Sequence, residues 1–337
     1  MPRFIGVDLH QTRFTVCFRG EDGSEQLQTY RLDRIEKFLE QLQRDDEVAV
    51  EATGNSAYFH DQVVSRVAKV RLVNPMQFKV ISTSSKKTDK RDAALLAQYL
   101  SQGLLPEVRP STPQRDQIKS LLATREQLVK TRTALKNKVH GVLAAHGLKR
   151  AGQNVDSHPG QERLLSLATD EAMRFELEIL IEEIRHLSQA IAKVNKQLSN
   201  PQYKLPGHEQ LKSIPGIGDL GATTLLCAIG SIQDFDDSKH LASYLGIVPS
   251  VHCSDRTAHY GPITKRGNRA ARHILVQCAW IAIRHHAGLR AFFLRIQARR
   301  GNGKAIIATA RKLLGLVHYT LTNHIVWEDC QAGLIAA

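Results

Sequence analysis

The sequence predicts an amino-terminal α/β domain followed by a carboxy-terminal part made mainly of helices. Short apolar runs separated by turn-forming residues fill the first hundred positions, which is typical of strands and short helices. Long helical periodicity follows, and beyond it the helical segments are separated by turns that contain Gly and Pro. We therefore expect three sections: residues 1–105, 106–200 and 201–337.

Composition narrows the class of protein. An apolar content of 42% over 337 residues is enough for real hydrophobic cores. We expect no membrane span, because no run of about 18 apolar residues occurs. The amino terminus enters an apolar strand directly, so we expect no secretory signal. Five scattered cysteines without a CxxC pair argue against structural zinc and fit reduced thiols in a cytoplasmic, nucleoid-associated protein.

Charge is distributed unevenly along the chain, whose formal net charge is +13. Residues 1–100 hold 15 Lys and Arg against 14 Asp and Glu, whereas residues 201–337 hold 16 against 8. Residues 256–327 contain 13 Lys and Arg and no acid at all. Solvated surfaces normally mix both signs, so we expect a polyanionic partner, and nucleic acid is the best candidate. A membrane surface fits less well, because these cations alternate with core residues.

The first section shows a definite order of elements. Three strands in succession are followed by helices that alternate with strands, which is the order of the ribonuclease-H-like fold. The expected elements are strands at 4–8, 13–19 and 25–32, a short helix at 35–42, a strand ending at Glu51, a helix at about 55–67, a strand at 69–73 and a helix that reaches Leu100.

Four acidic residues occupy special positions in this order. Asp8 and Glu51 each end an apolar strand, and Asp89 and Asp92 lie three residues apart where the last helix begins. Strand-end carboxylates and one helix face can meet at one edge of a sheet, where they would repel unless they bound divalent cations. We therefore predict a Mg²⁺ site, with Mn²⁺ as a substitute. The alternative is that each acid is only a helix cap or a solvated surface group.

The second section is predicted to be a helical arm (residues 106–200). Residues 113–146 are helical and basic, and we expect Arg125 and Lys136 to contact nucleic acid. Apolar residues from Met173 to Leu198 then recur at steps of 4 and 3, which is a heptad seam. The seam fits a helical hairpin or coiled coil, and an internal bundle and an intermolecular coil explain it equally well.

The third section contains a turn of the helix-hairpin-helix type, Ile214-Pro215-Gly216-Ile217-Gly218. In such a turn Gly216 and Gly218 let main-chain N–H groups approach a phosphate at a helix amino terminus. A purely structural turn between two helices is the alternative. Further along, Trp280, Phe292 and Phe293 fall in helical periods, and we expect them to pack in the core rather than stack on bases.

Several motifs together resemble one known family. They are Ile5-Gly6-Val7-Asp8, Val50-Glu51-Ala52-Thr53-Gly54, Lys87 to Ala93, Ile214 to Gly218, Tyr244 to Pro249, and Ile263 to Asn268 with Arg272. In this order they resemble the DEDD transposases of the insertion-sequence 110 group, which includes the Piv-type DNA invertases. The resemblance spans nearly the whole chain. It implies a RuvC-like first domain and a carboxy-terminal transposase domain.

The resemblance also implies a serine nucleophile shortly after the Tyr244–Pro249 segment, which is Ser254 in this chain. Where the family often has Ser-Ser-Gly-Gly, this sequence reads Cys253-Ser254-Asp255-Arg256. Ser250, Thr257 and Thr264 are therefore alternative hydroxyls. Attack by the serine would form a covalent phosphoserine link that keeps the phosphodiester energy for rejoining. Asp8, Glu51, Asp89 and Asp92 would hold the metal, in a site assembled between domains or subunits.

Partners follow from the same resemblance. It implies donor and target DNA, a structured non-coding RNA that pairs with both, and a dimer or tetramer. We expect Lys265, Arg266, Arg269 and Arg272 to contact phosphates, because base pairing would read the sequence and the protein would hold backbones. The other functions considered are a RuvC-like endonuclease that hydrolyses DNA, a DNA invertase of the same family, and a nucleic-acid-binding protein without catalysis.

Overall fold

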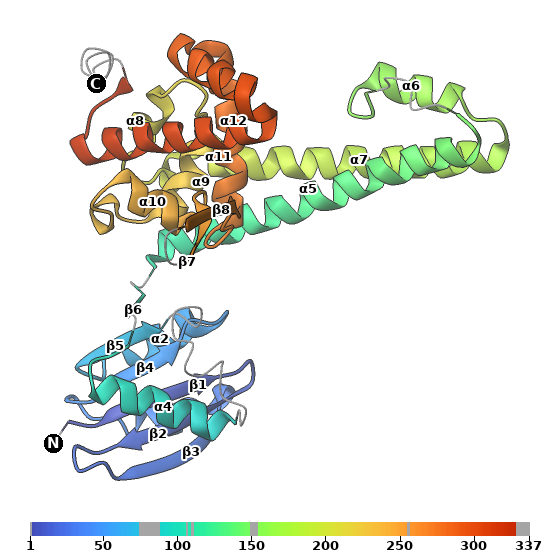
Figure 1. Cartoon of the computed structure of the whole chain (residues 1–337). Coiled ribbons are helices and arrows are strands. Elements are labelled where there is room, and N and C mark those ends of the chain that lie inside the picture. Colours follow the sequence, from blue (N-terminus) through green and yellow to red (C-terminus); the bar gives the residue numbers. More distant parts are fainter. Residues whose placement is uncertain are drawn as a thin grey trace. The chain divides into compact units, whose positions relative to one another are not determined.

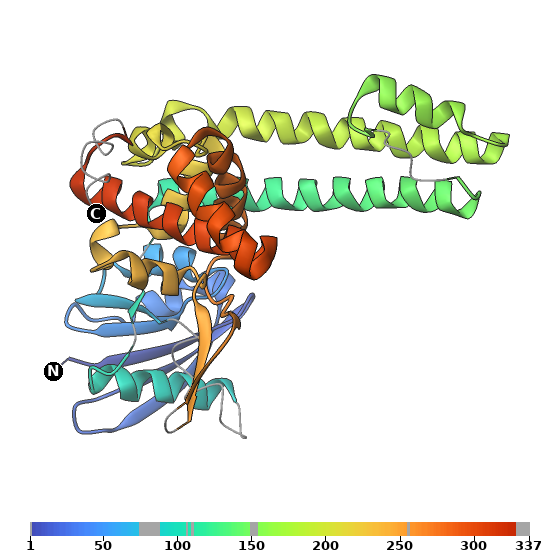
Figure 2. The same ribbon diagram turned by 45° about the horizontal axis from the view of Figure 1, so that its top comes forward.

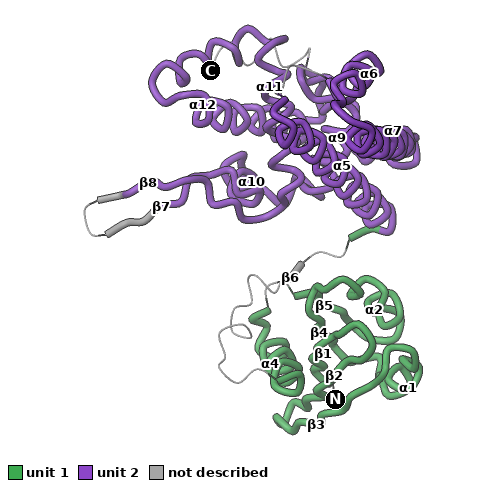
Figure 3. The backbone as a smooth tube through the Cα atoms, turned by 90° about the vertical axis from the view of Figure 1, so that its right-hand side faces the viewer, with its two compact units in different colours: residues 1–112 green, residues 113–337 purple. Residues whose placement is uncertain are grey.

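The protein folds into two compact units, Met1–Thr112 and Pro113–Ala337 (Figure 3). The computed structural model describes residues 2–73, 88–105, 107–108, 111–148, 154–254 and 257–327, without the side chains of 107–108 and 252–258. The helical arm, which we expected as a section of its own, belongs to the second unit.

A mixed sheet forms the first unit (Figure 1). Its strand order is β3-β2-β1-β4-β5-β6; β1 pairs antiparallel with β2 and parallel with β4. The elements are β1 (Phe4–Leu9), β2 (Arg13–Arg19), β3 (Glu25–Arg31), α1 (Glu36–Leu39), β4 (Glu47–Glu51), α2 (Ser56–Val63), β5 (Lys69–Val73), α4 (Asp89–Ser101) and β6 (Glu107–Val108). This order is consistent with the predicted ribonuclease-H-like fold. Helix α2 is shorter than expected, because residues 64–68 turn the chain into β5.

Helices cover both faces of this sheet. On one face α1 and α2 pack their aromatic rings on β2, with the centroids of Phe38 and Phe59 each 5.3 Å from that of Phe14. On the other face α4 packs Leu96 and Leu100 against the sheet. Strand β1 lies between these layers and is buried from Ile5 to Leu9, so a polar group at its end is held in a largely desolvated position.

Helix α4 lies close against β1 at Gly6. A Cβ atom at this position would lie 2.1 Å from the Ala93 carbonyl oxygen and 2.4 Å from the Ala97 nitrogen. Only glycine therefore permits this packing. The helix begins after Thr88, whose side chain accepts a hydrogen bond from the Arg91 N–H and caps the first turn.

Helices dominate the second unit, with one β-hairpin. The elements are α5 (Pro113–Ala145), α6 (His158–Ser166), α7 (Glu171–Leu198), α8 (His208–Ser213), α9 (Asp219–Ile229), α10 (Ser238–Tyr244), β7 (Pro249–Ser254), β8 (Thr257–Ile263), α11 (Arg269–His285) and α12 (Ala287–Asn323). Helix α12 is bent at Gly301, whose φ of 77° lies outside the helical region. Among the residues the structure describes, no helix combines the length and apolar character needed to cross a bilayer.

The helical arm is a hairpin of α5 and α7, which run side by side in both views (Figures 1 and 2). The heptad seam of α7 faces inward, since Met173, Leu177 and Ile184 are buried in a cluster shared with Val139 of α5. At the base of the arm, Ile118 joins the main core of the second unit. The seam is therefore filled within one chain.

Two motifs distant in the sequence meet in the second unit. Gly246 has a φ of 68°, and a Cβ there would lie 2.0 Å from the Arg266 carbonyl oxygen. A Cβ at Gly267 would likewise lie 2.0 Å from the Tyr244 carbonyl oxygen. Arg272 Nη1 donates hydrogen bonds to the carbonyl oxygens of Leu245, Arg266 and Gly267. The Tyr244–Pro249 segment and the loop before α11 therefore form one folded element.

Replacing Gly6 with Ala should destabilise the first unit by about 1–3 kcal/mol, because the new methyl group overlaps the α4 main chain. Hydrogen-exchange mass spectrometry should show faster exchange in peptides from β1 and α4. The control is Gly141→Ala in α5, where no atom lies near the added methyl group. That change should slow exchange in α5, because alanine favours a helix over glycine. Equal exchange in Gly6→Ala and the parent protein would contradict the close packing.

Candidate metal site and nucleic-acid-binding residues

The four predicted acids come from neighbouring elements of the first unit. Val7 of β1 pairs with Val50 of β4, and Asp8 and Glu51 are the next residues of these parallel strands. Asp89 and Asp92 lie in the first turn of α4. Asp8 is 8% exposed and Asp92 is 5% exposed, so two carboxylates are buried where solvent would otherwise stabilise their charge. We name these four residues the acidic cluster.

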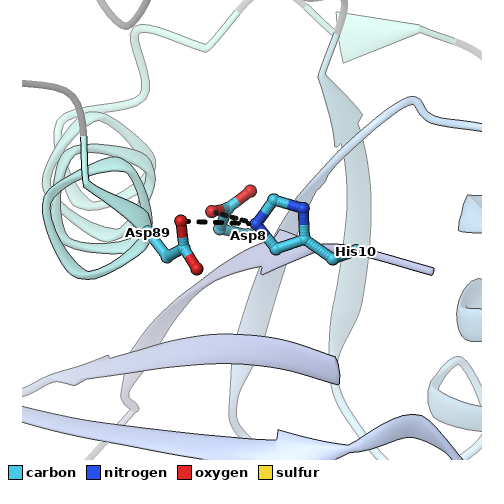
Figure 4. Close-up of side chains that lie close together, drawn as sticks. All are labelled: Asp8, His10 and Asp89. Carbon is cyan, nitrogen blue, oxygen red and sulfur yellow. Dashed lines mark ion pairs between the residues drawn. The ribbon is translucent and has the colours of Figure 1, made fainter. Parts of the chain in front are cut away.

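A histidine that the sequence analysis missed lies within the cluster (Figure 4). His10 Nε2 is 3.3 Å from Asp8 Oδ2 and 3.4 Å from Asp89 Oδ1. Its main-chain carbonyl accepts a hydrogen bond from Asn55 Nδ2 at 2.8 Å, which holds the end of β1 in place. The sequence feature that could have indicated His10 is its position two residues after Asp8, directly after the end of the same strand.

The carboxylates influence one another electrostatically. Burial raises the pKa of Asp8 above its usual value, and the charges of Asp89, Asp92 and Glu51 raise it further. The electrostatic effect of His10 lowers the pKa of Asp8 and partly offsets this rise. The other three carboxylates thus act on Asp8 as like charges, and a bound cation would relieve this repulsion.

The donor set fits a hard divalent cation. Ligand atoms of Asp8, His10 and Asp89 lie within 4.8 Å of one another. Two of these three ligands are carboxylate oxygens, which Mg²⁺ and Mn²⁺ prefer in proteins. Arg13 Nη2 lies 3.7 Å from Asp89 Oδ2, so a cationic side chain already borders the cluster.

The Ile214–Gly218 turn joins α8 to α9, and its two glycines differ in their surroundings. Gly216 has a φ of 96°, and a Cβ there would lie 2.6 Å from the Cys278 carbonyl oxygen and from the Ala282 nitrogen of α11. Packing against α11 is thus sufficient to explain Gly216. Gly218 is exposed and has no atom near its missing Cβ. Of the two glycines, Gly218 is the one whose surroundings leave room for a ligand.

An acid lies at the amino terminus of α9, directly after this turn. Asp219 Oδ1 lies 3.0 Å from Lys212 Nζ and 3.8 Å from Nε2 of the buried His208. A phosphate at this helix end would have to share it with the Asp219 carboxylate. Phosphate binding at the turn therefore stays a prediction.

The predicted phosphate-binding cations fall into two groups. Lys265, Arg266 and Arg269 are exposed. Arg125 is different: its Nε donates to Asn195 Oδ1 at 2.7 Å, across the two helices of the arm, and burial lowers its pKa. Lys136 forms an ion pair with Asp156. Arg125, Lys136 and Arg272 thus each make a contact within the protein that the sequence did not predict, and phosphate binding by these three residues stays a prediction.

Ser254 is the last residue of β7 and pairs with Thr257 of β8. Its side chain, like that of Thr257, lies outside the described part of the structure. Thr264 Oγ1, one of the alternative nucleophiles, is buried without a hydrogen-bond partner among the described residues. Burial makes Thr264 a poor candidate for attack on DNA.

Mg²⁺ should stabilise the first unit through the acidic cluster. At about ten times its dissociation constant, a bound ion adds about 1.4 kcal/mol, which raises Tm by a few degrees. Asp89→Asn should abolish this rise in a thermal melt, because the ion loses a charged ligand. Asp45→Asn, an exposed acid at the opposite end of β4, removes the same charge and should keep the rise. An equal rise in both variants would place the ion elsewhere.

Comparison with known families places both units in the same group. The DEDD transposase family of the IS110 type, described as "Transposase", matches residues 5–147. The family described as "Transposase IS116/IS110/IS902 family" matches residues 208–294. The first match includes the whole acidic cluster. The second includes the α8–α9 turn, the β-hairpin and α11.

Individual relatives agree over most of the chain. It is 27% identical to the transposase for insertion sequence element IS1111A of Coxiella burnetii, over 95% of this chain and 90% of the relative. It is 24% identical to the transposase for insertion sequence element IS1328 of Yersinia enterocolitica, over 95% of this chain and 96% of the relative. It is 28% identical to the pilin gene-inverting protein of Moraxella lacunata, over 82% of this chain and 80% of the relative. With both family matches in the same order as the two units, the chain belongs to the IS110 family of transposases.

Proposed function

We propose that the protein is a DNA recombinase that moves an insertion sequence, cutting and rejoining DNA through a covalent phosphoserine intermediate. The observation that carries this proposal is the close approach of Asp8, Asp89 and His10, whose ligand atoms lie within 4.8 Å of one another, in a chain of the IS110 family. Glu51 ends the strand beside β1, and Asp92 lies in the same helix turn as Asp89. The relatives support action on DNA, since they are named as insertion-sequence transposases and pilin gene-inverting proteins.

The two units divide the chemistry. In the first unit, Asp8, Glu51, Asp89 and Asp92 would hold Mg²⁺, or Mn²⁺ in its place, and His10 would orient the carboxylates of Asp8 and Asp89. When bound, such an ion neutralises phosphate charge and favours departure of the leaving oxygen. The second unit would supply the nucleophile, Ser254, and the cations Lys265, Arg266 and Arg269 that contact phosphates.

The covalent step exchanges one phosphate ester for another. The Ser254 hydroxyl loses its proton, its Oγ forms a bond to phosphorus, and the bond from phosphorus to the deoxyribose oxygen breaks. The released deoxyribose oxygen takes up a proton. In the second step the hydroxyl of another DNA end attacks the phosphorus and displaces Oγ. The number of ester bonds is unchanged, so no external energy source is needed.

A structured non-coding RNA encoded by the element would select the DNA in this proposal. The acid-free stretch 256–327, with its 13 Lys and Arg, favours a large polyanionic partner such as RNA. Two other functions remain as alternatives. One is a RuvC-like endonuclease that hydrolyses DNA with the acidic cluster alone, which the closeness of Asp8 and Asp89 supports. The other is an invertase, which the name of the Moraxella relative supports. The adduct experiment below separates hydrolysis from recombination.

The test is capture of the covalent intermediate. The protein is incubated with Mg²⁺, labelled DNA from the ends of its element and RNA transcribed from the element, and a protease-sensitive adduct is expected on a denaturing gel. Ser254→Ala and Asp89→Asn should each reduce the adduct by several orders of magnitude, because one removes the nucleophile and the other a metal ligand. Ser250→Ala is the matched control and should keep it.

Alkali identifies the linked residue. Phosphoserine esters undergo β-elimination, so base should release the DNA and leave dehydroalanine at position 254, which mass spectrometry locates. Strand cleavage that persists in Ser254→Ala without an adduct would establish the hydrolytic enzyme instead. An adduct that needs no RNA would remove the guide from the proposal.

The exposed cations should contribute to DNA binding in a way that salt reveals. Arg266→Ala should lower the slope of log affinity against log salt by about one unit, because one phosphate contact is lost. Arg272→Ala should instead lower thermal stability, since three carbonyl oxygens lose their donor. An unchanged slope for Arg266→Ala would mean that this side chain only faces solvent.

A further inference from the structure

The second unit contains a groove that the proposed chemistry does not use. Its volume is about 810 Å³, and its walls come from α10, the β7–β8 hairpin and α12. We name it the basic groove, because five of the residues that line it are Lys or Arg and none is acidic: Lys239, Arg300, Lys304, Arg311 and Lys312.

One wall of the basic groove is a single face of α12 beyond its bend. Lys304, Ile307, Ala308 and Arg311 follow the i, i+3, i+4, i+7 spacing that places side chains on one face of a helix. Lys304 and Arg311 thus stand about two turns apart with apolar residues between them. Such a row offers positive charge at intervals along a line rather than at one point.

These cations have no acidic partners in the described part of the chain. None of the five forms an ion pair with a described carboxylate, although ion pairs are frequent on the arm and in the first unit. Cations that line a concave wall without counter-charges create a local positive potential, which attracts a polyanion. A surface that served only solubility would carry both acidic and basic side chains.

Two aromatic rings border the groove, and they differ in what covers them. Phe292, which we expected in the core, is only half-buried, and the cations of Lys312 and Arg295 lie 5.1 Å and 5.5 Å from its centroid. Its faces therefore hold cations in position. Tyr260 of β8 is 72% exposed, and no other described ring stacks on it.

An exposed aromatic ring beside a row of unpaired cations matches the requirements of single-stranded nucleic acid. The cations follow the phosphates, and the ring stacks on a base, which is possible only where the base is not already stacked and paired. Duplex DNA hides its base faces and would leave Tyr260 without a partner. The exposed Pro262 on the hairpin side of the groove would contact sugars and base edges.

We propose that the basic groove binds a single strand of DNA, with one unpaired base stacked on Tyr260 and the adjoining phosphates on Lys304 and Arg311. Since this binding requires neither Ser254 nor the acidic cluster, it can be tested apart from catalysis. A strand released from its duplex during recombination is the DNA that such a groove would hold.

The binding test uses the full chain in EDTA with a fluorescent thymidine oligonucleotide of about 12 nucleotides, a length within the range of single-strand grooves. Tyr260→Ala should weaken binding roughly tenfold, while Tyr260→Phe, which keeps the ring, should bind like the parent. Lys304→Ala with Arg311→Ala should lower the salt slope by about 1.4, or about 0.7 per phosphate on a single strand. Lys37→Ala removes an exposed charge from the first unit and should change neither value.

A cross-linking test locates the base. Irradiation of the same oligonucleotide carrying 5-iodouracil should join it to Tyr260, as seen by mass spectrometry of the β8 peptide. Unchanged affinity in Tyr260→Ala together with no cross-link at that residue would overturn the proposal. The proposal would also be overturned if duplex DNA or the RNA of the same sequence bound more tightly than the single-stranded DNA and lost as much affinity in Tyr260→Ala. The groove would then serve that other nucleic acid. EDTA prevents metal-dependent cleavage, so failure of the adduct experiment would not alter these outcomes.

Discussion

The contact between Gly6 and helix α4 is the constraint on which the candidate metal site depends. Because Gly6 has no side chain, the main chain of α4 lies directly on β1 at Ala93 and Ala97. This contact fixes the first turn of α4, and with it Asp89 and Asp92, beside the end of β1. The parallel pairing of β1 with β4 adds Glu51. One close packing contact and one strand register thus bring Asp8 and Asp89 together and place Glu51 and Asp92 on the neighbouring strand and the same helix turn.

The two units differ in the sign of the charges that they bring together. In the first, like charges are brought together and partly buried, which raises the pKa of Asp8 and is only partly offset by His10. The arrangement costs stability until a cation fills it, and such strain is typical of functional sites. In the second, cations accumulate without acids along the basic groove and the loop before α11. One unit is therefore suited to holding a cation and the other to holding a polyanion.

Packing within the second unit gives several motif residues a structural role that does not require a ligand. Gly216, Gly246 and Gly267 each allow main chains to approach at distances that a Cβ would prevent. Arg272 binds three carbonyl oxygens, and Arg125 links the two helices of the arm. Residues of a predicted DNA-binding motif can thus be required by the fold alone, whereas Gly218, Lys265, Arg266 and Arg269 are exposed.

The sequence by itself determined the strands and helices of the first unit, the heptad seam and the acid-free stretch, because periodicity and charge are local properties of a chain. It also indicated where Asp8, Glu51, Asp89 and Asp92 would lie, since strand ends and helix starts are visible in it. Only the tertiary structure decided that His10 lies beside Asp8 and Asp89 and that Phe292 is only half-buried. It also decided that Arg272 binds main-chain carbonyl oxygens and that Tyr260 and cations of α12 line one groove. The physical reason is that these facts depend on distances between residues far apart in the chain, which no local pattern contains.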